Sequence, residues 1–436
     1  MPPPRQRAGM YLNQPEAPQI KDIMTILFVT YGGGHVQMVA PVIRQLQRIR
    51  PELRVECLAL TTAQPVLRAM EIPFRTMSEF LALFPAEARE WGEELAVERH
   101  NDGVGIAYEE SVAYLGLSFW DLVETHGEPR ARALLAEKGT QAFLQRRVAA
   151  RIIDELKPTV IATTNSPRME HASVLEGKAA SIPTLTMVDL FGRFNFCPIV
   201  ADHVSVFSPK TRTNLVEAGL MAEATECHFF GNPSFDKYLE VQPSNAGDGE
   251  NRDPALLFLD MPAFLDFDRD VIHTRTANDV VQDLDDLSAA CAAQDLDLMI
   301  RPHPSQDRGP YERWIAGSEH GHRTRIVAGG PLEPVLRQVR LVIARSSTSL
   351  LEAVFCGCRT LQINYQKTDN IELPLAQMGL SWPVRHRSEL AETVARALSD
   401  DVTAEAHWQR RLETLPTEPA APRIAAFLAS LAGSSD

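Results

Sequence analysis

The feature that most constrains the fold is a strand-like run that leads through three glycines into a helix-like run. Residues 25–30 read TILFVT, and the glycines follow at 32–34. Beyond them Val39, Val42 and Leu46 recur at the spacing of one helix face. A strand, a tight turn and a helix in this order are typical of a parallel sheet that helices cover on both faces.

This alternation continues along the chain in two series. The first series has further apolar runs of strand length at 53–60, 158–163, 182–188 and 203–207. A polar stretch at 242–254 separates it from the second series. The second series has its runs at 255–259, 296–300, 324–327, 340–344 and 360–363. We therefore predict an α/β protein of two Rossmann-like, doubly wound domains that face a central cleft.

The expected domain boundaries follow from these series, because a chain of 436 residues exceeds one ordinary core. We expect a disordered tail over 1–21, an N-terminal Rossmann-like domain over 22–232 and a C-terminal Rossmann-like domain over 233–411, followed by a helix and tail over 412–436. Within the first domain, about 76–150 is mostly helix-like with aromatic residues, which predicts a helical insertion. Such an insertion either shapes a substrate cleft or only packs, and the sequence favours neither.

Charge and composition exclude several classes of function. With 43 Lys and Arg against 57 Asp and Glu, the formal charge of −14 repels a nucleic-acid backbone. No apolar run approaches the roughly 20 residues of a membrane span. The first residues have prolines and charges instead of the apolar run of a secretory signal, so we expect a cytoplasmic protein. Cys356 and Cys358 are either a metal or redox site or two buried apolar residues, and the second interpretation is favoured.

The glycine turn is the first candidate binding segment. Without Cβ atoms, Gly33 and Gly34 would let backbone N–H groups approach a ligand, and a helix N-terminus favours anions. The turn matches neither the Walker pattern nor GxGxxG, and a tight turn that needs small residues explains it equally well. His35 is a candidate general base, or only a polar residue at the start of a helix.

Two loops of the second series carry polar groups that could bind a diphosphate. Arg301 and His303 follow a strand in the stiff sequence RPHP, at the edge where open α/β sheets bind ligands. After a later strand come Ser346, Ser347, Thr348 and Ser349, whose hydroxyls precede a helix. Glu352 follows about one turn into that helix and could accept hydrogen bonds from a sugar diol. An exposed turn and a helix cap are the competing explanations.

Together these segments resemble the GT-B superfamily of nucleotide-sugar enzymes over most of 25–400. GGGH resembles the glycine-rich loop of the peptidoglycan N-acetylglucosaminyltransferase, and Gly231–Pro233 resembles the stretch that leads into the hinge of UDP-N-acetylglucosamine 2-epimerases. SSTSLLEA is similar to the diphosphate and ribose loop of that superfamily, and RPHP to the donor-phosphate motif of bacterial capsule glycosyltransferases. The resemblance implies that the serine loop, Glu352, Arg301 and His303 bind the donor. It also implies that 233–411 is the nucleotide-sugar domain and 22–232 the acceptor domain.

Departures from the epimerase pattern favour a transferase. The chain has Thr163–Ser166 where the epimerases have carboxylates of the first-domain cleft, and Asp260–Pro262 where they have a segment rich in His and Arg. A transferase needs only a donor site, a base for the acceptor and groups that stabilise the negative charge on the departing diphosphate. Asp189, after a first-domain strand, is the leading candidate base and His35 the second. A helix cap or a buried ion pair explains Asp189 equally well.

We thus expect a metal-independent glycosyltransferase without a cofactor. Its donor would be a nucleotide-sugar, expected to be UDP-linked, and its acceptor a saccharide or lipid-linked precursor of bacterial surface polysaccharide. The alternatives are a UDP-sugar 2-epimerase-like isomerase and a non-catalytic nucleotide-sugar-binding protein. Arg44, Arg48, Arg50 and Arg54 either dock a membrane surface or form a solvated face.

Overall fold

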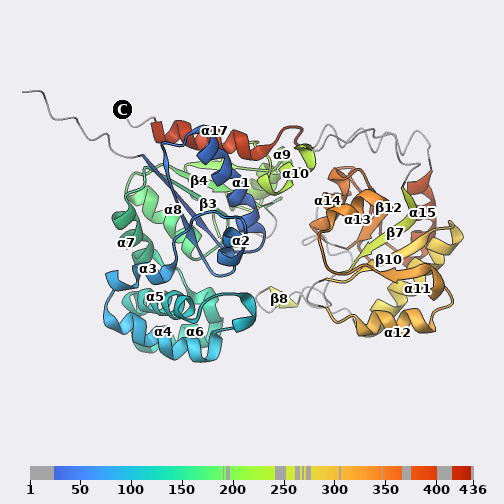
Figure 1. The fold of residues 1–436 in the computed structure, drawn as a ribbon, viewed down its shortest axis with the longest axis horizontal. Coiled ribbons are helices and arrows are strands. Elements are labelled where there is room, and N and C mark those ends of the chain that lie inside the picture. The colour runs from blue at the N-terminus through green and yellow to red at the C-terminus, as the bar shows by residue number, and fades with distance from the viewer. Residues whose placement is uncertain are drawn as a thin grey trace, which may run out of the picture.

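Each series of strands forms its own parallel sheet in the computed structural model of the chain (Figure 1). The structure describes residues 24–189, 191–192, 197–240, 252–260, 266–267, 270–271, 276–303, 306–345, 347–365, 375–399 and 415–433. The tail expected over 1–21 lies outside them. The predicted fold class, two Rossmann-like doubly wound domains, is confirmed.

The first sheet has six strands in the order β2-β1-β3-β4-β5-β6, all parallel. They are β1 (Thr25–Thr30), β2 (Arg54–Ala59), β3 (Val160–Thr164), β4 (Thr184–Met187), β5 (His203–Ser205) and β6 (Glu226–His228). The five strands predicted from apolar runs are confirmed, and β6 was not predicted. Its three residues include no β-branched side chain, so the usual strand signal is missing.

Both faces of this sheet are covered, which explains why β1 is apolar without interruption. Leu27 and Val29 pack against the insertion, whereas Ile26 and Phe28 pack against α1 (Gly34–Ile49). The helices α2 (Ala63–Ala69), α8 (Met169–Ala179) and α9 (Pro209–Glu217) complete this domain.

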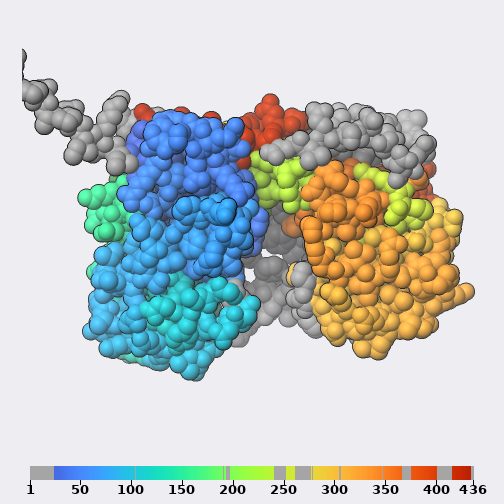
Figure 2. Space-filling model, viewed as in Figure 1, coloured from blue at the N-terminus to red at the C-terminus, as the bar shows by residue number. Residues whose placement is uncertain are grey.

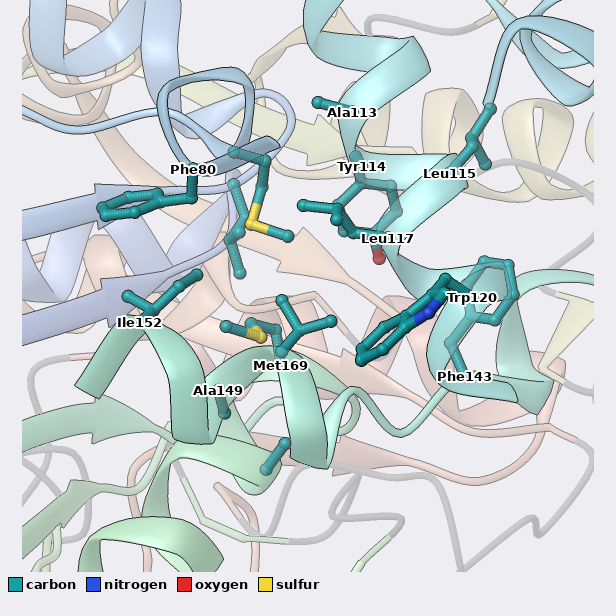
Figure 3. Close-up of a cluster of buried hydrophobic side chains, with 14 of the residues drawn as sticks. Phe80, Ala113, Tyr114, Leu115, Leu117, Trp120, Phe143, Ala149, Ile152 and Met169 are labelled. Atoms are coloured by element: carbon teal, nitrogen blue, oxygen red, sulfur yellow. The ribbon is translucent and has the colours of Figure 1, made fainter. Parts of the chain in front are cut away.

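The insertion consists of helices stacked on one another. They are α3 (Met77–Phe80), α4 (Ala86–Arg99), α5 (Tyr108–His126), α6 (Glu128–Lys138) and α7 (Arg146–Leu156). Figure 3 shows apolar side chains of this cluster gathered between α5 and α7, among them Leu117, Trp120 and Ile152. The close approach of α4 and α5 requires a glycine at position 92, because a Cβ there would lie 2.1 Å from the carbonyl oxygen of Val112. The insertion therefore shares one core with the face of the first sheet that carries Leu27 and Val29.

The second sheet has the order β11-β10-β7-β12-β13-β14 and is also parallel. Its strands are β7 (Asp253–Leu259), β10 (Asp297–Arg301), β11 (Thr324–Ile326), β12 (Val339–Ala344), β13 (Arg359–Ile363) and β14 (Trp382–Val384). A short hairpin, β8 (Asp266–Phe267) and β9 (Asp270–Val271), follows β7 in the chain. The five strands predicted for this series are confirmed; β14 and the hairpin were not predicted.

Helices cover both faces of the second sheet as well. One face carries α11 (Ala277–Ala293), α12 (Gly309–Gly317) and α15 (Leu390–Leu398), and the other carries α13 (Glu333–Gln338) and α14 (Ser349–Phe355). Cys356 and Cys358 are buried in the second of these cores, and burial raises the pKa of the Cys356 thiol to about 12. The interpretation of this pair as buried apolar residues is confirmed.

The chain crosses between the two lobes twice, and the two crossings are joined. The first runs through Gly231, which has φ 98°, into α10 (Asp236–Glu240). The second leads back to α17 (Ala420–Gly433), which packs beside α1 on the first domain (Figure 1). Buried Asp236 accepts hydrogen bonds of 2.7 Å from the backbone N–H groups of both Ala420 and Ala421. A residue of one crossing therefore caps the helix that ends the other.

Replacing Asp236 with Ala should destabilise the protein by about 2 kcal/mol, because two N–H groups at the start of α17 lose a charged acceptor. Urea unfolding measures this loss. Glu94→Ala is the matched control, since Glu94 is 55% exposed and pairs with Arg132 only at the surface. We expect less than about 1 kcal/mol from the control. Equal losses in the two variants would contradict the capping role.

Candidate functional site

The first half of the candidate site lies where the strand order of the first sheet reverses. β1 and β3 are neighbours there; the glycine turn follows β1, and Thr164 is the last residue of β3. Ligands of open α/β sheets bind at such a switch point, beyond the carboxyl ends of the strands. The turn needs its glycines, because a Cβ at Gly32 would lie 1.9 Å from Thr62 Oγ1 and Gly33 has φ 66°.

A chain of three side chains crosses this switch point. His35 Nδ1 lies 2.6 Å from Thr164 Oγ1, and the Thr164 hydroxyl donates a hydrogen bond to Glu170 Oε2. A hydroxyl has a single hydrogen, so Thr164 accepts the hydrogen bond from His35 Nδ1–H. In the neutral imidazole the lone pair is then on Nε2. His35 is thus held in the tautomer that a general base requires.

The Glu170 carboxylate is the buried end of this series of hydrogen-bonded side chains. Its side chain is 0% exposed and accepts hydrogen bonds from the backbone N–H groups of Tyr31, at 2.9 Å, and Ser166, at 3.2 Å. Burial raises the pKa of the Glu170 carboxyl, and the neighbouring His35 and the hydrogen bonds oppose this shift. The loops after β1 and β3 are therefore fixed to one another through a single buried carboxyl group.

Asp189 lies beside the start of α1, as do Gly34 and His35. The residue follows β4, and its backbone N–H donates to Asn165 Oδ1 at 2.9 Å. Its Oδ1 accepts a hydrogen bond of 3.5 Å from Asn232 Nδ2, and its Oδ2 is 3.7 Å from the place that a Cβ at Gly34 would occupy. The structure thus brings together the two candidate bases and the glycine turn.

The second half of the candidate site begins after β12. Ser346 lies outside the described residues; Thr348 is exposed, and Ser347 and Ser349 are half-buried. Arg345 holds the start of this loop through an ion pair of 2.7 Å with buried Asp283 and by stacking over the Tyr365 ring. Thr348 precedes α14 without capping it through its side chain. Its hydroxyl therefore remains available at the surface.

Glu352 connects this loop to the hinge. It is half-buried on α14 and accepts a hydrogen bond from the Tyr238 hydroxyl of α10. Tyr238 is 3% exposed, and burial together with the Glu352 charge raises the pKa of its hydroxyl. The carboxylate is thereby held in one orientation at the inner end of α14.

Arg301 ends β10 and His303 follows it, so β7 lies between these residues and the serine loop. The Arg301 guanidinium donates to the carbonyl oxygens of Gly329, at 3.3 Å, and Gly330, at 2.7 Å. His303 is exposed, and its backbone N–H donates to Gln306 Oε1 at 2.7 Å.

Buried contacts fix the loop of His303 to the sheet. Gln306 donates to the Tyr311 hydroxyl at 2.9 Å, and that hydroxyl donates to Asp260 at 2.6 Å. Asp260 directly follows β7, the strand between the two polar loops. The exposed imidazole therefore projects from a loop that is anchored to the neighbouring strand.

Comparisons with known proteins bear on the fold. No family model and no curated protein matches the chain. MurG from Acinetobacter baumannii is 15% identical, with a TM-score of 0.54, over 93% of this chain and 99% of its own. UDP-GlcNAc 2-epimerase from Neisseria meningitidis, bound to UDP-GlcNAc, is 11% identical, with a TM-score of 0.53, over 93% and 99%. A glycosyltransferase from Rickettsia africae ESF-5 is 11% identical, with a TM-score of 0.54, over 95% and 100%.

The chain has the GT-B fold. The fold expected from the resemblance to that superfamily is confirmed, and the structural neighbours include a glycosyltransferase as well as a UDP-GlcNAc 2-epimerase. Figure 2 shows the surface of this GT-B chain hollowed between the first lobe, in blue and cyan, and the second, in orange. The two halves of the candidate site belong to different lobes.

Sequence reasoning missed Glu170 and Tyr238. A signal for Glu170 was present, because an acidic residue at the start of a helix after a strand commonly accepts backbone N–H groups. Nothing in the sequence linked Tyr238 to Glu352, which is 114 positions away. Both residues act through tertiary contacts.

The expected membrane contact has limited support in this GT-B chain. Among the described residues, no helix is both long and apolar enough to cross a bilayer. Arg50 and Arg54 pair with Glu52 and Glu56, which reduces the positive charge that they offer. Membrane docking stays a prediction.

Proposed function

We propose that this protein is a glycosyltransferase that uses His35 as the base for its acceptor. The observation that carries the proposal is the chain from Glu170 through Thr164 to His35, which leaves Nε2 as the proton acceptor beside the glycine turn. A sugar hydroxyl needs such a base because it is a weak nucleophile at neutral pH. Asp189, which lies by the same turn, is the second candidate for this role.

The donor is a nucleotide-sugar, and we assign UDP as its nucleotide. The Ser346–Ser349 loop and Arg301 would bind the diphosphate together with His303, and Glu352 would accept hydrogen bonds from the ribose diol. Gly33 and Gly34 would contact the donor from the first lobe. Among the structural neighbours, one epimerase is bound to UDP-GlcNAc and another protein to UDP, which supports a nucleotide-sugar ligand here.

The reaction would proceed by attack of the acceptor oxygen at the anomeric carbon. The oxygen forms the new glycosidic bond, the bond from that carbon to the diphosphate breaks, and the proton passes to His35 Nε2. Arg301 would offset the negative charge that grows on the departing diphosphate. Rotation about Gly231–Pro233 would exclude water and limit hydrolysis of the donor.

An epimerase-like isomerase is the second candidate function, because epimerases are among the structural neighbours. The transferase is favoured because Thr164 and Asn165 support the His35 and Asp189 contacts in the first-domain cleft, where the epimerase pattern has carboxylates. We assign the acceptor to the saccharides or lipid-linked precursors of bacterial surface polysaccharide. A cytoplasmic location, with docking at the inner face of a membrane, accompanies that assignment.

Three outcomes of one experiment separate the functions. The protein is incubated with UDP-sugars, with and without candidate acceptors, while UDP release and the proton NMR spectrum of the sugar are recorded. Acceptor-dependent release of UDP supports the transferase. A changed sugar configuration without acceptor supports the isomerase, and saturable binding with neither change supports a binding protein.

Replacing Glu170 with Gln should lower kcat by about 10- to 100-fold with little change in KM for the donor, since the charge that supports His35 is lost. Glu170→Asp is the control that keeps the charge. A second measurement, the pH dependence of stability, reports the protonation of the Glu170 carboxyl group. Its folded pKa is raised above 4.5, so the folded protein binds a proton there that the unfolded chain has released. The contribution of this carboxyl group to wild-type stability should therefore fall as pH rises from 4.5 through its folded pKa.

The Gln variant lacks this titration, so its stability relative to wild type should improve over the same range of pH. Urea unfolding at several pH values measures how the difference in free energy of unfolding between the two proteins changes with pH. A constant difference between them does not affect this comparison. A parallel pH dependence in both proteins would contradict the assigned pKa direction. An unchanged kcat would contradict the supporting role of Glu170.

A further inference from the structure

A second polar cluster lies at the outer edge of the first sheet. It consists of His203 on β5 and of Glu226 and His228 on β6, which we call the His-Glu-His cluster. In the parallel register His203 pairs with Glu226, and Ser205 pairs with His228. Residues two apart on a strand share a face, so all three side chains project from the same side of the sheet.

The possible ligand atoms of this cluster lie close to one another, with a different Glu226 oxygen facing each imidazole. His203 Nδ1 lies 3.3 Å from Glu226 Oε2, His228 Nε2 lies 3.5 Å from Glu226 Oε1, and the two imidazole nitrogens are 3.5 Å apart. Ligands about 2.0–2.1 Å from a tetrahedral zinc ion are separated by about 3.3–3.4 Å. The two imidazole nitrogens, 3.5 Å apart, thus have nearly the spacing of two zinc ligands, and one oxygen of the Glu226 carboxylate lies near each of them, all three residues offering ligand atoms within 4.8 Å of one another.

Aromatic packing holds both imidazole rings in place. His228 stacks on Phe230 with centroids 5.0 Å apart, and Phe427 of α17 contacts His228 at 4.3 Å and His203 at 5.1 Å. The side chains of His203 and His228 are 18% and 17% exposed, and that of Glu226 is 61% exposed. The histidines are thus preoriented, and the open side at Glu226 gives an ion a path from solvent.

We propose that the His-Glu-His cluster binds one zinc-like divalent metal ion. Two imidazole nitrogens and a carboxylate suit zinc in both chemistry and spacing, and a fourth position is left for water. The ion would tie the edge strand β6 to β5 and, through Phe427, to α17. This site is separate from the residues proposed for glycosyl transfer, so it does not depend on that function.

The test uses untagged full-length protein, because a polyhistidine tag would itself bind the metal. After chelator treatment and dialysis, zinc alone is titrated by calorimetry, and cobalt alone by absorption spectroscopy. We expect one ion per chain, visible bands of four-coordinate cobalt, and a higher Tm of the wild type in zinc. His203→Ala and His228→Ala should each weaken zinc binding by at least about 100-fold.

Two further variants keep the test decisive. Glu226→Gln changes an exposed side chain without removing packing, so it should fold and still weaken binding. His126→Ala, at the exposed end of α5, should bind zinc as the wild type does. Absence of saturable binding to the wild type would overturn the proposal, as would equal affinity in the wild type and the Glu226→Gln protein.

Discussion

Replacing His35 with Gln is expected to lower kcat for UDP release by about 10²- to 10⁴-fold, the usual contribution of a general base. Glutamine can still donate to Thr164 Oγ1, but its amide accepts no proton from the acceptor hydroxyl. The affinity for the donor should change little, since His35 is assigned to the acceptor side. Steady-state kinetics with both substrates varied separates kcat from the two KM values.

Two companion variants decide between the candidate bases. Asp189→Asn should have the smaller effect on kcat if His35 is the base, and the larger effect if Asp189 is. His126→Gln, on the exposed end of α5, should leave all kinetic constants unchanged. Full activity of His35→Gln would show that His35 is not the base. The transferase proposal would then lose its main support.

Replacing Glu352 with Ala is expected to weaken UDP binding by about 10- to 100-fold, the equivalent of losing hydrogen bonds to a charged acceptor. The effect should be similar for UDP and for the UDP-sugar, because the assigned contact is to the ribose. Calorimetry with UDP measures it directly. An unchanged Kd would show that the ribose binds elsewhere.

Tyr238→Phe is the matched control for this experiment. It removes the hydroxyl that donates to Glu352 and keeps the ring in the core. Loss of affinity in both variants would mean that the orientation of Glu352 matters as well as its charge. A loss confined to Glu352→Ala would mean that the carboxylate alone is required.

The strands and their order of appearance could be predicted from the sequence because they are buried on both faces. Runs such as 26–29 and 341–344 are apolar without interruption, and the helices between them have a clear period. The short edge strands β6 and β14 could not be predicted, since three residues give no periodic pattern. The packing of α17 on the first domain was also missed, because the sequence of an apolar helix face does not indicate which surface it packs against.

The candidate site could be predicted only in part, for a related reason. Glycine turns and polar loops after strands are visible in the sequence, so Gly33, His35, Asp189 and Arg301 were all singled out. What orients them is not visible. Glu170 acts on His35 through Thr164, and this depends on hydrogen bonds between segments that are far apart in the chain.

The cap that Asp236 places on α17 also limits how the two lobes can shift against one another. A sliding displacement would pull the first crossing away from the start of α17 and break two hydrogen bonds at once. A swing about a line through both crossings would keep them. We therefore expect the lobes to rotate about an axis through both crossings. A sequence change near 416–420 should alter this rotation as strongly as a change at Gly231, where a Cβ would lie 3.2 Å from Pro416 Cγ and 3.3 Å from Ala420 Cβ.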